Sequence, residues 1–312
     1  MSKTKYQEIL LSFETRLYDL FTECNGKSVV LWGYGKSGHA IEAAFRRHGK
    51  QIDILMDKDN RIHNVERPYI LDSYSPKSFI VLIAFSMDDD ARHRLSEAGF
   101  HYGINYIPLK EFFYGEACTN KAVSFYDWIE NAADIDVQQP LKLVQGECRG
   151  YEATKDYALL KILDTFCFHK DDRIFDYGCG RGATFCIFEK YGIQWGGIEY
   201  NRDLYECCVK NMKTLGLPTS DIYCGDATDY TNIDGYNYFH LFNPFIGDIF
   251  RKVIHQIEQS YKRKPRTIIL IYSNPFCHKI VLEDGIFQCS KKIQADYFIK
   301  NVNIYRIEAV AK

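Results

Sequence analysis

A glycine-rich turn in the second half of the chain carries the clearest signal for ligand binding. The sequence D-Y-G-C-G-R-G runs from Asp176 to Gly182, directly after a short apolar stretch that reads as a buried strand. Because glycine has no Cβ atom, such a turn lets the backbone pass close to a ligand, and the acidic side chain can engage an ammonium group directly or through water. We therefore predict that Asp176, Gly178, Gly180 and Gly182 border a binding site, with helix packing as the alternative role of Gly182.

Acidic side chains at the ends of the next two predicted strands extend this site. Glu199 ends a strand about 20 residues after the first, where a carboxylate can bind both hydroxyl groups of a ribose. Asp226 and Ala227 follow the next strand, and a carboxylate beside an apolar wall suits the exocyclic amine of adenine. A solvated loop acid is the alternative interpretation of Asp226. These residue types at successive strand ends predict one site for an adenosyl ligand.

Apolar strands that alternate with helical patterns must hold these residues in place. In the second half of the chain we expect a helix over 154–166 and strands near 173–177, 196–200, 221–224, 238–242, 267–272, 286–291 and 302–308. In the first half we expect helices over 4–23, 37–48 and 88–98 and strands near 28–32, 53–56, 79–85 and 102–107. Strands separated by helices predict two parallel sheets of an α/β fold, each covered on both faces.

Residues from Gly150 to the end of the chain resemble a class I S-adenosylmethionine-dependent methyltransferase, on the basis of the D-x-G-x-G-x-G turn and the strand-end acids. The resemblance implies a seven-stranded sheet whose last strand is antiparallel, and S-adenosylmethionine as the cofactor. It further implies the contacts of each part of that cofactor: Asp176, Gly178, Gly180 and Gly182 for the methionine and ribose, Glu199 for the ribose, and Asp226 with Ala227 for the adenine.

The segment G-Y-E-A-T, from Gly150 to Thr154, precedes the first helix of this half. Thr154 is suited to cap the N-terminus of that helix. In the methyltransferases that this sequence resembles, a segment at this place closes over the cofactor. The resemblance therefore implies that Tyr151 and Thr154 contact the cofactor as well.

The fourth strand of this half ends in F-N-P-F, which places Asn243 and Phe245 at the same edge of the sheet. The pattern resembles a shortened form of the N-P-P-F motif of amino-group methyltransferases. That resemblance implies that Asn243 accepts hydrogen bonds from an acceptor amine and that the Phe245 ring stacks on it. One proline is missing, so contact with the cofactor is the alternative role of Asn243. His240, inside the same strand, reads as a core histidine with satisfied hydrogen bonds, and a catalytic base is the alternative.

A second glycine loop, G-Y-G-K-S-G from Gly33 to Gly38, follows the first strand of the chain, and Asp57 ends the second strand. In a dinucleotide-binding turn Gly33 would make the tight bend, Gly35 would let the backbone approach a pyrophosphate, Gly38 would allow helix-to-sheet packing, and Asp57 would bind a ribose. This segment resembles the small nucleotide-binding-type domains attached to sugar-modifying enzymes, which implies a bound nucleotide or nucleotide sugar. A loop retained only for packing is the alternative.

The two glycine loops and the irregular stretch between them predict two Rossmann-like domains. We place a nucleotide-binding-type domain at 1–115, a linker at 116–150 and a methyltransferase-type domain at 151–312. The resemblance implies methyl transfer from S-adenosylmethionine to a small molecule or to a glycan or nucleotide-sugar precursor. Two rival functions stay open: a non-catalytic nucleotide-binding scaffold, and an NAD(P)-dependent oxidoreductase, which would lack a catalytic Tyr-x-x-x-Lys at a suitable distance.

Composition narrows the expected partners. With 39 Lys and Arg residues against 41 Asp and Glu residues, the formal net charge is −2, so no global basic field favours nucleic acid. The apolar runs are shorter than the roughly 20 residues of a membrane helix, and residues 1–5 lack the features of a secretory signal, so we expect a cytoplasmic protein. Eleven cysteines without a CxxC pair and nine dispersed histidines indicate no metal site. The helix over 4–23 would either build a homodimer or cap the first sheet.

Overall fold

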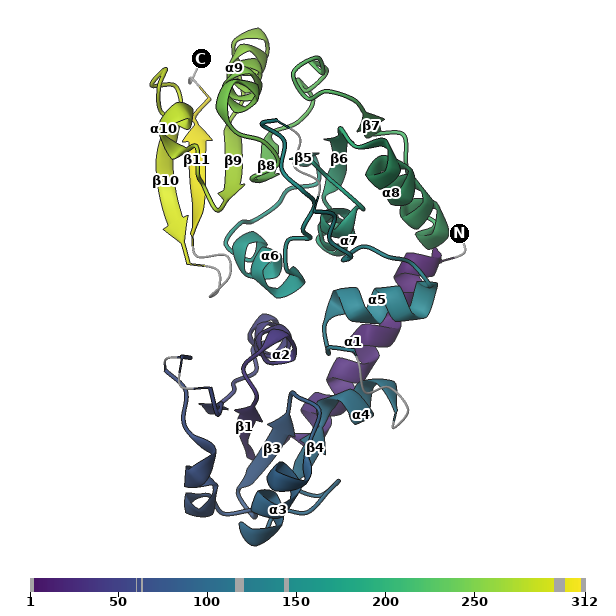
Figure 1. Ribbon diagram of the computed structural model, residues 1–312, viewed down its shortest axis with the longest axis vertical. Helices are drawn as coiled ribbons and strands as arrows, with labels where there is room; N and C mark the ends of the chain where they lie inside the picture. Colours follow the sequence, from purple (N-terminus) through teal and green to yellow (C-terminus); the bar gives the residue numbers. More distant parts are fainter. Residues whose placement is uncertain are drawn as a thin grey trace. The chain divides into compact units, whose positions relative to one another are not determined.

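The structure is a computed structural model that describes residues 3–59, 61–62, 64–115, 121–142, 146–294 and 301–309. Its contacts divide the chain into two units (Figure 1). The C-terminal unit comprises Met1–Tyr6 and Ala133–Lys312, and the N-terminal unit comprises Gln7–Ala132. This division falls inside the predicted linker, and the domain boundaries at 115 and 150 stay predictions. Among the described residues, no helix combines the length and apolar character that spanning a bilayer requires.

A seven-stranded sheet forms the centre of the C-terminal unit, in the order β10-β11-β9-β8-β5-β6-β7. Its strands are β5 (Arg173–Tyr177), β6 (Gln194–Glu199), β7 (Ile222–Cys224), β8 (Tyr238–Phe242), β9 (Ile268–Ser273), β10 (Gln288–Ile293) and β11 (Val302–Ile307). The neighbours from β7 to β9 pair in parallel, whereas β11 runs antiparallel to both β9 and β10. The predicted seven-stranded α/β sheet with an antiparallel last strand is therefore confirmed.

The direction in which the chain adds strands reverses between β5 and β8. From β5 the chain continues to β6 and β7 on one side, and it then returns to form β8 and β9 on the other. Ligands of open α/β sheets bind beyond the carboxyl ends of the strands at such a reversal. A ligand site is thus expected next to Tyr177 and Phe242, the last residues of β5 and β8.

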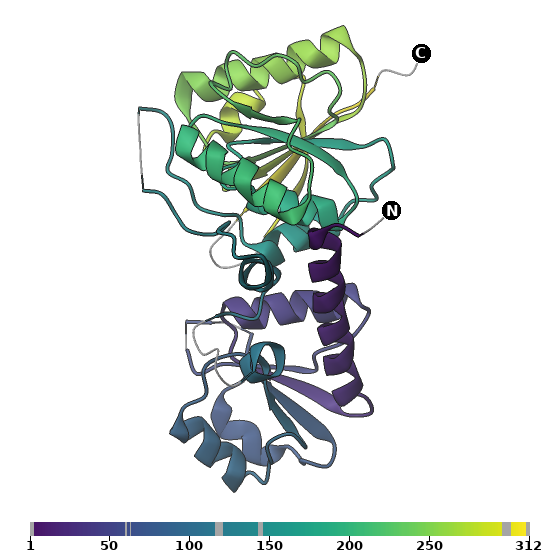
Figure 2. The same ribbon diagram turned by 90° about the vertical axis from the view of Figure 1, so that its right-hand side faces the viewer.

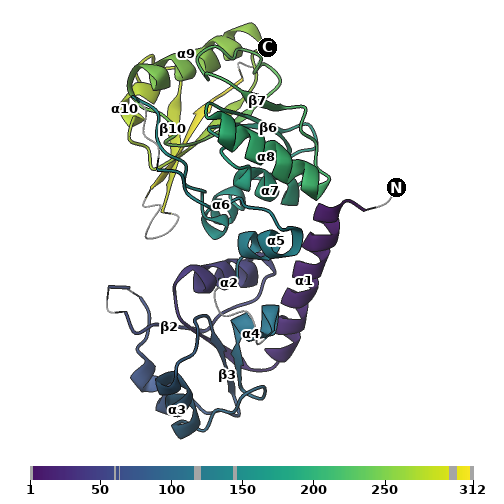
Figure 3. The same ribbon diagram turned by 45° about the vertical axis from the view of Figure 1, so that its right-hand side comes forward.

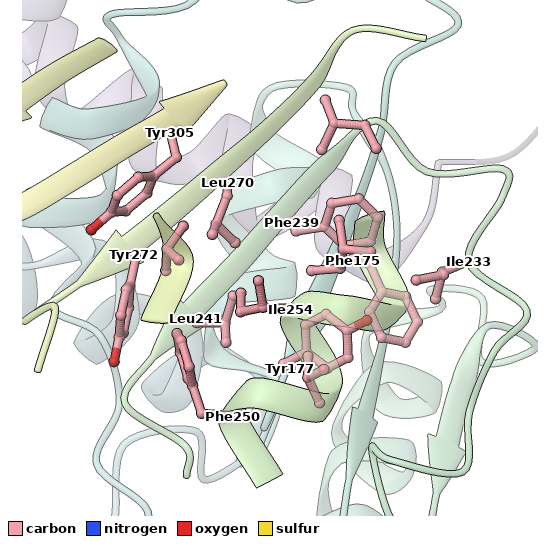
Figure 4. Close-up of a cluster of buried hydrophobic side chains, with 14 of the residues drawn as sticks. Phe175, Tyr177, Ile233, Phe239, Leu241, Phe250, Ile254, Leu270, Tyr272 and Tyr305 are labelled. Atoms are coloured by element: carbon pink, nitrogen blue, oxygen red, sulfur yellow. The ribbon is translucent and has the colours of Figure 1, made fainter. Parts of the chain in front are cut away.

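One face of this sheet packs against helix α9 (Gly247–Arg263). Phe250 and Ile254 of α9 belong to the same buried cluster as Phe175 and Tyr177 of β5, and Figure 4 shows these side chains between the helix and the strands. Successive side chains of a strand point to opposite faces. Asp176, which lies between Phe175 and Tyr177, therefore faces the other side of the sheet.

The opposite face is covered by α7 (Ala183–Lys190) and α8 (Arg202–Leu215), which lie on the far side of the strands from α9 in Figure 2. Thr184 of α7 donates a hydrogen bond to Asp176, which fixes this face of β5 to the start of the helix. Two shorter helices complete the unit, α6 (Asp156–Leu163) and α10 (His278–Val281).

The N-terminal unit is a second, smaller α/β sheet, in the parallel order β2-β1-β3-β4. Its strands are β1 (Ser28–Trp32), β2 (Ile54–Met56), β3 (Phe79–Ile83) and β4 (Tyr106–Pro108). The helices are α1 (Lys5–Glu23), α2 (Lys36–Arg47), a 3-10 helix (Pro68–Ser73), α3 (Asp89–Glu97), α4 (Leu109–Tyr114) and α5 (Phe125–Ala133). The first two residues of α1 and the last residue of α5 are assigned to the C-terminal unit. The predicted Rossmann-like order of strands and helices is present in this unit.

The predicted strand over 102–107 is wrong at its start, because β4 begins only at Tyr106. Gly103 has a left-handed φ of +70°, and the side-chain oxygen of Asn105 accepts a hydrogen bond from the backbone N–H of His101. These two features build a turn where the apolar pattern indicated extended backbone.

Candidate functional site

A cavity of about 280 Å³ lies at the carboxyl edge of the C-terminal sheet, where the strand order reverses. The side chains and backbone that line it come from the ends of β5, β6 and β8, from the turn after β7, and from the segment before α6. Most of the predicted site residues lie in this lining, namely Tyr151, Thr154, Asp176, Gly178, Glu199, Asp226, Ala227 and Phe245. Gly180, Gly182 and Asn243 are not among the lining residues.

Each glycine of the turn after β5 has a left-handed backbone that disfavours other residues. The φ angles of Gly178, Gly180 and Gly182 are +76°, +54° and +84°. A Cβ atom on Gly178 would lie 2.6 Å from Cβ of Pro244, and one on Gly180 would lie 2.0 Å from a ring carbon of Tyr151. The Tyr151 ring therefore covers Gly180, while Gly178 borders the cavity directly.

Gly182 has a different role, which is the alternative that the sequence left open for it. It is the N-cap residue of α7, and a Cβ atom there would lie 2.8 Å from Sγ of Cys208 on α8. Figure 3 shows the two helices next to each other. Gly182 thus allows close helix packing.

Glu199 ties the glycine turn to the end of β6. Its Oε2 accepts a hydrogen bond from the backbone N–H of Gly180 at 2.9 Å, and its Oε1 accepts one from Asn201 at 2.8 Å. Burial of the carboxyl raises its pKa above the usual value. Because an ionised carboxylate has about four acceptor positions, Glu199 can also bind hydroxyl groups of a ligand in the cavity.

Asp226 is an ordered, half-buried acid and not a freely solvated one. Its Oδ1 accepts a hydrogen bond from the backbone N–H of Thr228 at 2.8 Å, which is the Asx-turn geometry. Ala227 beside it is buried. Both residues line the cavity, so a carboxylate and a small apolar side chain are adjacent in its wall.

Asp176 is bonded on both carboxylate oxygens inside the protein. Oδ1 lies 2.7 Å from Nδ1 of His240, and Oδ2 accepts a hydrogen bond from Oγ1 of Thr184 at 2.5 Å. His240 is 1% exposed and lines the cavity, as does Thr184. The sequence pattern did not identify either partner as a site residue.

Thr154 does not cap α6, in contrast to the prediction from the sequence. The helix begins at Asp156 with Lys155 in the N-cap position, and no side chain caps it. Thr154 is instead 3% exposed and part of the cavity lining. The chain is still extended at Lys155, so the helix starts later than the pattern of apolar residues indicates.

The two residues of the F-N-P-F turn are placed differently. Phe245 is buried and lines the cavity. The side chain of Asn243 instead joins the loop after β8 to β9 and to the residue that follows β9. Its oxygen accepts a hydrogen bond from the Tyr272 hydroxyl at 2.8 Å, and its nitrogen donates to the carbonyl of Asn274.

A strap made of residues 141–142 and 146–154 also borders the cavity, and sequence reasoning missed its first part. Cys148 forms an antiparallel bridge with Phe245, and the Arg149 N–H donates to the Pro244 carbonyl at 2.9 Å. The side chain of Glu147 accepts from the N–H of Ile249 at 2.9 Å. Leu141, Cys148 and Arg149 line the cavity, so part of the predicted linker belongs to the site.

The charges around the cavity are mainly negative. Among its described lining residues are four acids, Glu152, Asp176, Glu199 and Asp226, and a single arginine or lysine, Arg149. Such a lining favours a cationic or neutral ligand over a phosphate-rich one.

The N-terminal glycine loop is organised by Asp57. Oδ2 of Asp57 accepts a hydrogen bond from the backbone N–H of Tyr34 at 2.5 Å. A Cβ atom on Gly38 would lie 2.1 Å from the carbonyl oxygen of Gly33, so Gly38 is needed for packing, whereas nothing lies within 4 Å of one on Gly35. Asp57 thus contacts the loop, and the nucleotide that the two would bind stays a prediction.

Comparison with solved structures shows distant similarity over about half of the chain. The PH0226 protein from Pyrococcus horikoshii OT3 is 12% identical, with 48% of this chain and 88% of that chain covered and a TM-score of 0.40. A ribosomal protein L11 methylase from Lactobacillus delbrueckii subsp. bulgaricus is 13% identical, with 49% and 78% covered and a TM-score of 0.37. An RNA methyltransferase from Salinibacter ruber, in complex with S-adenosyl-L-homocysteine, is 15% identical, with 51% and 96% covered and a TM-score of 0.37.

No protein-family model matches the sequence, and no curated protein matches it either. Structural similarities as distant as these carry no conclusion about activity.

Proposed function

We propose that the C-terminal unit binds S-adenosylmethionine and transfers its methyl group to a small-molecule or sugar acceptor. The observation that supports this proposal is the convergence of a left-handed glycine turn with Glu199 and Asp226 on one cavity. The three features come from three different strand ends, in the order in which the parts of an adenosyl ligand would meet them.

The residues present fit this cofactor. A Cβ atom on Gly178 would clash with Pro244, and both residues line the cavity, so only glycine fits this part of the wall. Glu199 offers acceptor positions for two ribose hydroxyls, and Asp226 offers them for an exocyclic amine. The acid-rich lining suits a sulfonium cation.

Bound S-adenosylmethionine would supply an electrophilic methyl group. The chain positions the reactants. Glu199 would hold the ribose and Asp226 the adenine amine, and Phe245 would form the apolar wall beside the reacting centre. Fixing two reactants in line is itself a large source of rate enhancement. The strap would limit the access of water, since it is joined to Pro244 and Phe245 by backbone contacts.

The charge of the cavity lining restricts the chemical class of methyl acceptor. Four acids oppose a single arginine among the described lining residues, so a neutral or cationic acceptor fits this cavity better than a nucleic acid. A nucleotide-sugar acceptor would have to hold its phosphates outside this cavity. We therefore propose a small uncharged or amine-bearing acceptor.

The proposal is tested by titrating S-adenosylhomocysteine into the full-length protein and into two matched variants. Glu199→Gln removes the charge that would hold the ribose and keeps an oxygen for one backbone N–H. We expect it to weaken binding by about 1–3 kcal/mol. Glu206→Gln is the control, because Glu206 is exposed and pairs with Arg202 at 2.9 Å, away from the cavity. Equal affinities of the two folded variants would contradict the proposal.

A further inference from the structure

The buried imidazole of His240 has one ring nitrogen without a partner. β5 and β8 pair with Asp176 opposite His240, so both side chains point to the same face of the sheet. Nδ1 of His240 lies 2.7 Å from Oδ1 of Asp176. Within the described part of the chain, Nε2 has no hydrogen-bond partner, although the residue is 1% exposed and lines the cavity.

The free nitrogen can accept a hydrogen bond. Asp176 accepts from Nδ1, and in the tautomer that carries its one hydrogen on Nδ1, Nε2 presents its lone pair. Phe188, whose ring lies 6.1 Å from the imidazole at 76°, is an apolar neighbour. Buried polar atoms in native proteins are almost always hydrogen-bonded. A ligand with an N–H or O–H donor would satisfy this one.

The order of the polar groups across the sheet indicates which part of a ligand would do so. The strands follow one another as β8, β5, β6 and β7. His240 is on β8, Asp176 is on β5, Glu199 ends β6, and Asp226 lies just after β7. With the ribose at Glu199 and the adenine at Asp226, the amino-acid part of the cofactor falls at β5 and β8. Its ammonium group is the hydrogen-bond donor of that part.

We propose that Nε2 of His240 accepts a hydrogen bond from the α-ammonium group of S-adenosylmethionine, and that Asp176 acts through His240 as a positioning residue. This inference rests on the proposed function. It differs from direct contact between Asp176 and the ammonium, because Asp176, which accepts from His240 and Thr184, would act from behind the imidazole ring. Asp176 fixes the tautomer and places a negative charge behind the ring.

Two substitutions of His240 separate its two nitrogens. The amide nitrogen of His240→Asn takes the place of Nδ1 and keeps the bond to Asp176, but nothing replaces Nε2. The longer side chain of His240→Gln brings an amide oxygen to the place of Nε2. We expect His240→Asn to weaken the binding of S-adenosylhomocysteine by about 10- to 100-fold. His240→Gln should recover part of that loss of affinity.

Three probes in calorimetry distinguish a ligand contact from a structural role. S-adenosylhomocysteine has the ammonium and the carboxylate, its decarboxylated analogue keeps the ammonium, and 5′-methylthioadenosine has neither. His240→Asn should weaken the binding of the first two probes and leave the affinity for the third within about twofold of that of the unchanged protein. Asp176→Asn, which still accepts from Nδ1, should give a smaller loss with the same selectivity.

The outcomes separate the two proposals. Equal weakening of all three probes, or an unchanged affinity for S-adenosylhomocysteine, would overturn the role of His240 while the cofactor site stands. Weakening of S-adenosylhomocysteine alone would assign the contact to the carboxylate and overturn the ammonium contact. If the unchanged protein binds none of the probes, the proposed function fails, and the inference fails with it.

Discussion

The ring of Tyr151 lies directly on the backbone of Gly180, so that a Cβ atom added to Gly180 would fall 2.0 Å from Cε2 of the ring. The Tyr151 hydroxyl donates a hydrogen bond to the Val137 carbonyl at 2.5 Å, which holds the ring from its other end. The glycine turn and the strap are therefore shaped to fit each other.

Gly180→Ala should destabilise the protein more than Gly192→Ala. Both glycines have left-handed φ angles, +54° and +67°, but nothing lies within 4 Å of a Cβ atom on Gly192. Backbone strain alone should cost each variant about 1–2 kcal/mol, and only Gly180→Ala must also displace Tyr151. Urea unfolding measures the difference, and calorimetry should show weaker S-adenosylhomocysteine binding in Gly180→Ala only. If the two variants lost equal stability and equal affinity, the close contact between Gly180 and Tyr151 would be contradicted.

Tyr151→Phe and Tyr151→Ala should have different effects. The first removes only the hydrogen bond to Val137, which should lower the free energy of unfolding by about 1 kcal/mol and leave S-adenosylhomocysteine binding nearly unchanged. The second uncovers Gly180 and should weaken binding at least tenfold, by about 1.4 kcal/mol. Wild-type affinity in Tyr151→Ala would remove Tyr151 from the site.

Asn243→Ala should be less stable than Asn243→Gly. Asn243 has a φ of +46°, and its side chain bonds to Tyr272 and Asn274. Both variants lose these bonds, but glycine tolerates the left-handed backbone, which should make it more stable than alanine by about 1 kcal/mol. Because Asn243 does not line the cavity, S-adenosylhomocysteine should bind the glycine variant as tightly as the wild type. A tenfold loss of affinity in a folded variant would instead make Asn243 a cofactor contact.

The stability of the protein should contain a pH-dependent contribution from Glu258. Burial, and then the carboxyl group of Asp284, raise the pKa of Glu258 from 4.5 to about 7, against a lowering effect of Lys262. Nδ1 of His255 also lies 3.8 Å from its carboxylate. The folded protein holds this proton more tightly than the unfolded chain. The contribution is therefore fully present below pH 4.5 and is lost as the pH rises to about 7.

Thermal unfolding of the wild type and of Glu258→Gln across this range checks the sign. The glutamine cannot ionise, so the midpoint of the wild type should fall relative to that of the variant as the pH rises. Parallel curves for the two proteins would show that Glu258 ionises in the folded state as it does in the unfolded chain.

The strand-end part of the site could be predicted because its signals are local. Asp176 and Glu199 lie at the ends of apolar strands and Asp226 just after one, each within a few residues of a glycine. The carboxyl ends of parallel strands meet at one edge of a sheet. The individual strands followed from the alternation of apolar runs with helical patterns, whereas the seven-stranded sheet was implied by the resemblance to class I methyltransferases. Thr154 shows the limit of such reasoning, because its residue type suits a helix cap but the backbone stays extended for one more residue.

The rest of the site depends on contacts between distant parts of the chain. His240 was interpreted as a core histidine with satisfied hydrogen bonds, which is right for Nδ1 and wrong for Nε2. Its position opposite Asp176 follows from the register of β5 and β8, which are not consecutive strands. The strap has no periodic pattern, and Arg149 reaches the site by bonding to Pro244.

Calorimetric titration of the full-length protein with S-adenosylhomocysteine tests the central claim most directly. The ligand is unreactive and contains each part that the cavity is proposed to bind. Binding of one ligand per chain with a Kd in the micromolar range is the predicted result. The absence of both binding heat and thermal stabilisation at ligand concentrations up to about 1 mM would contradict the claim that this cavity is a cofactor site.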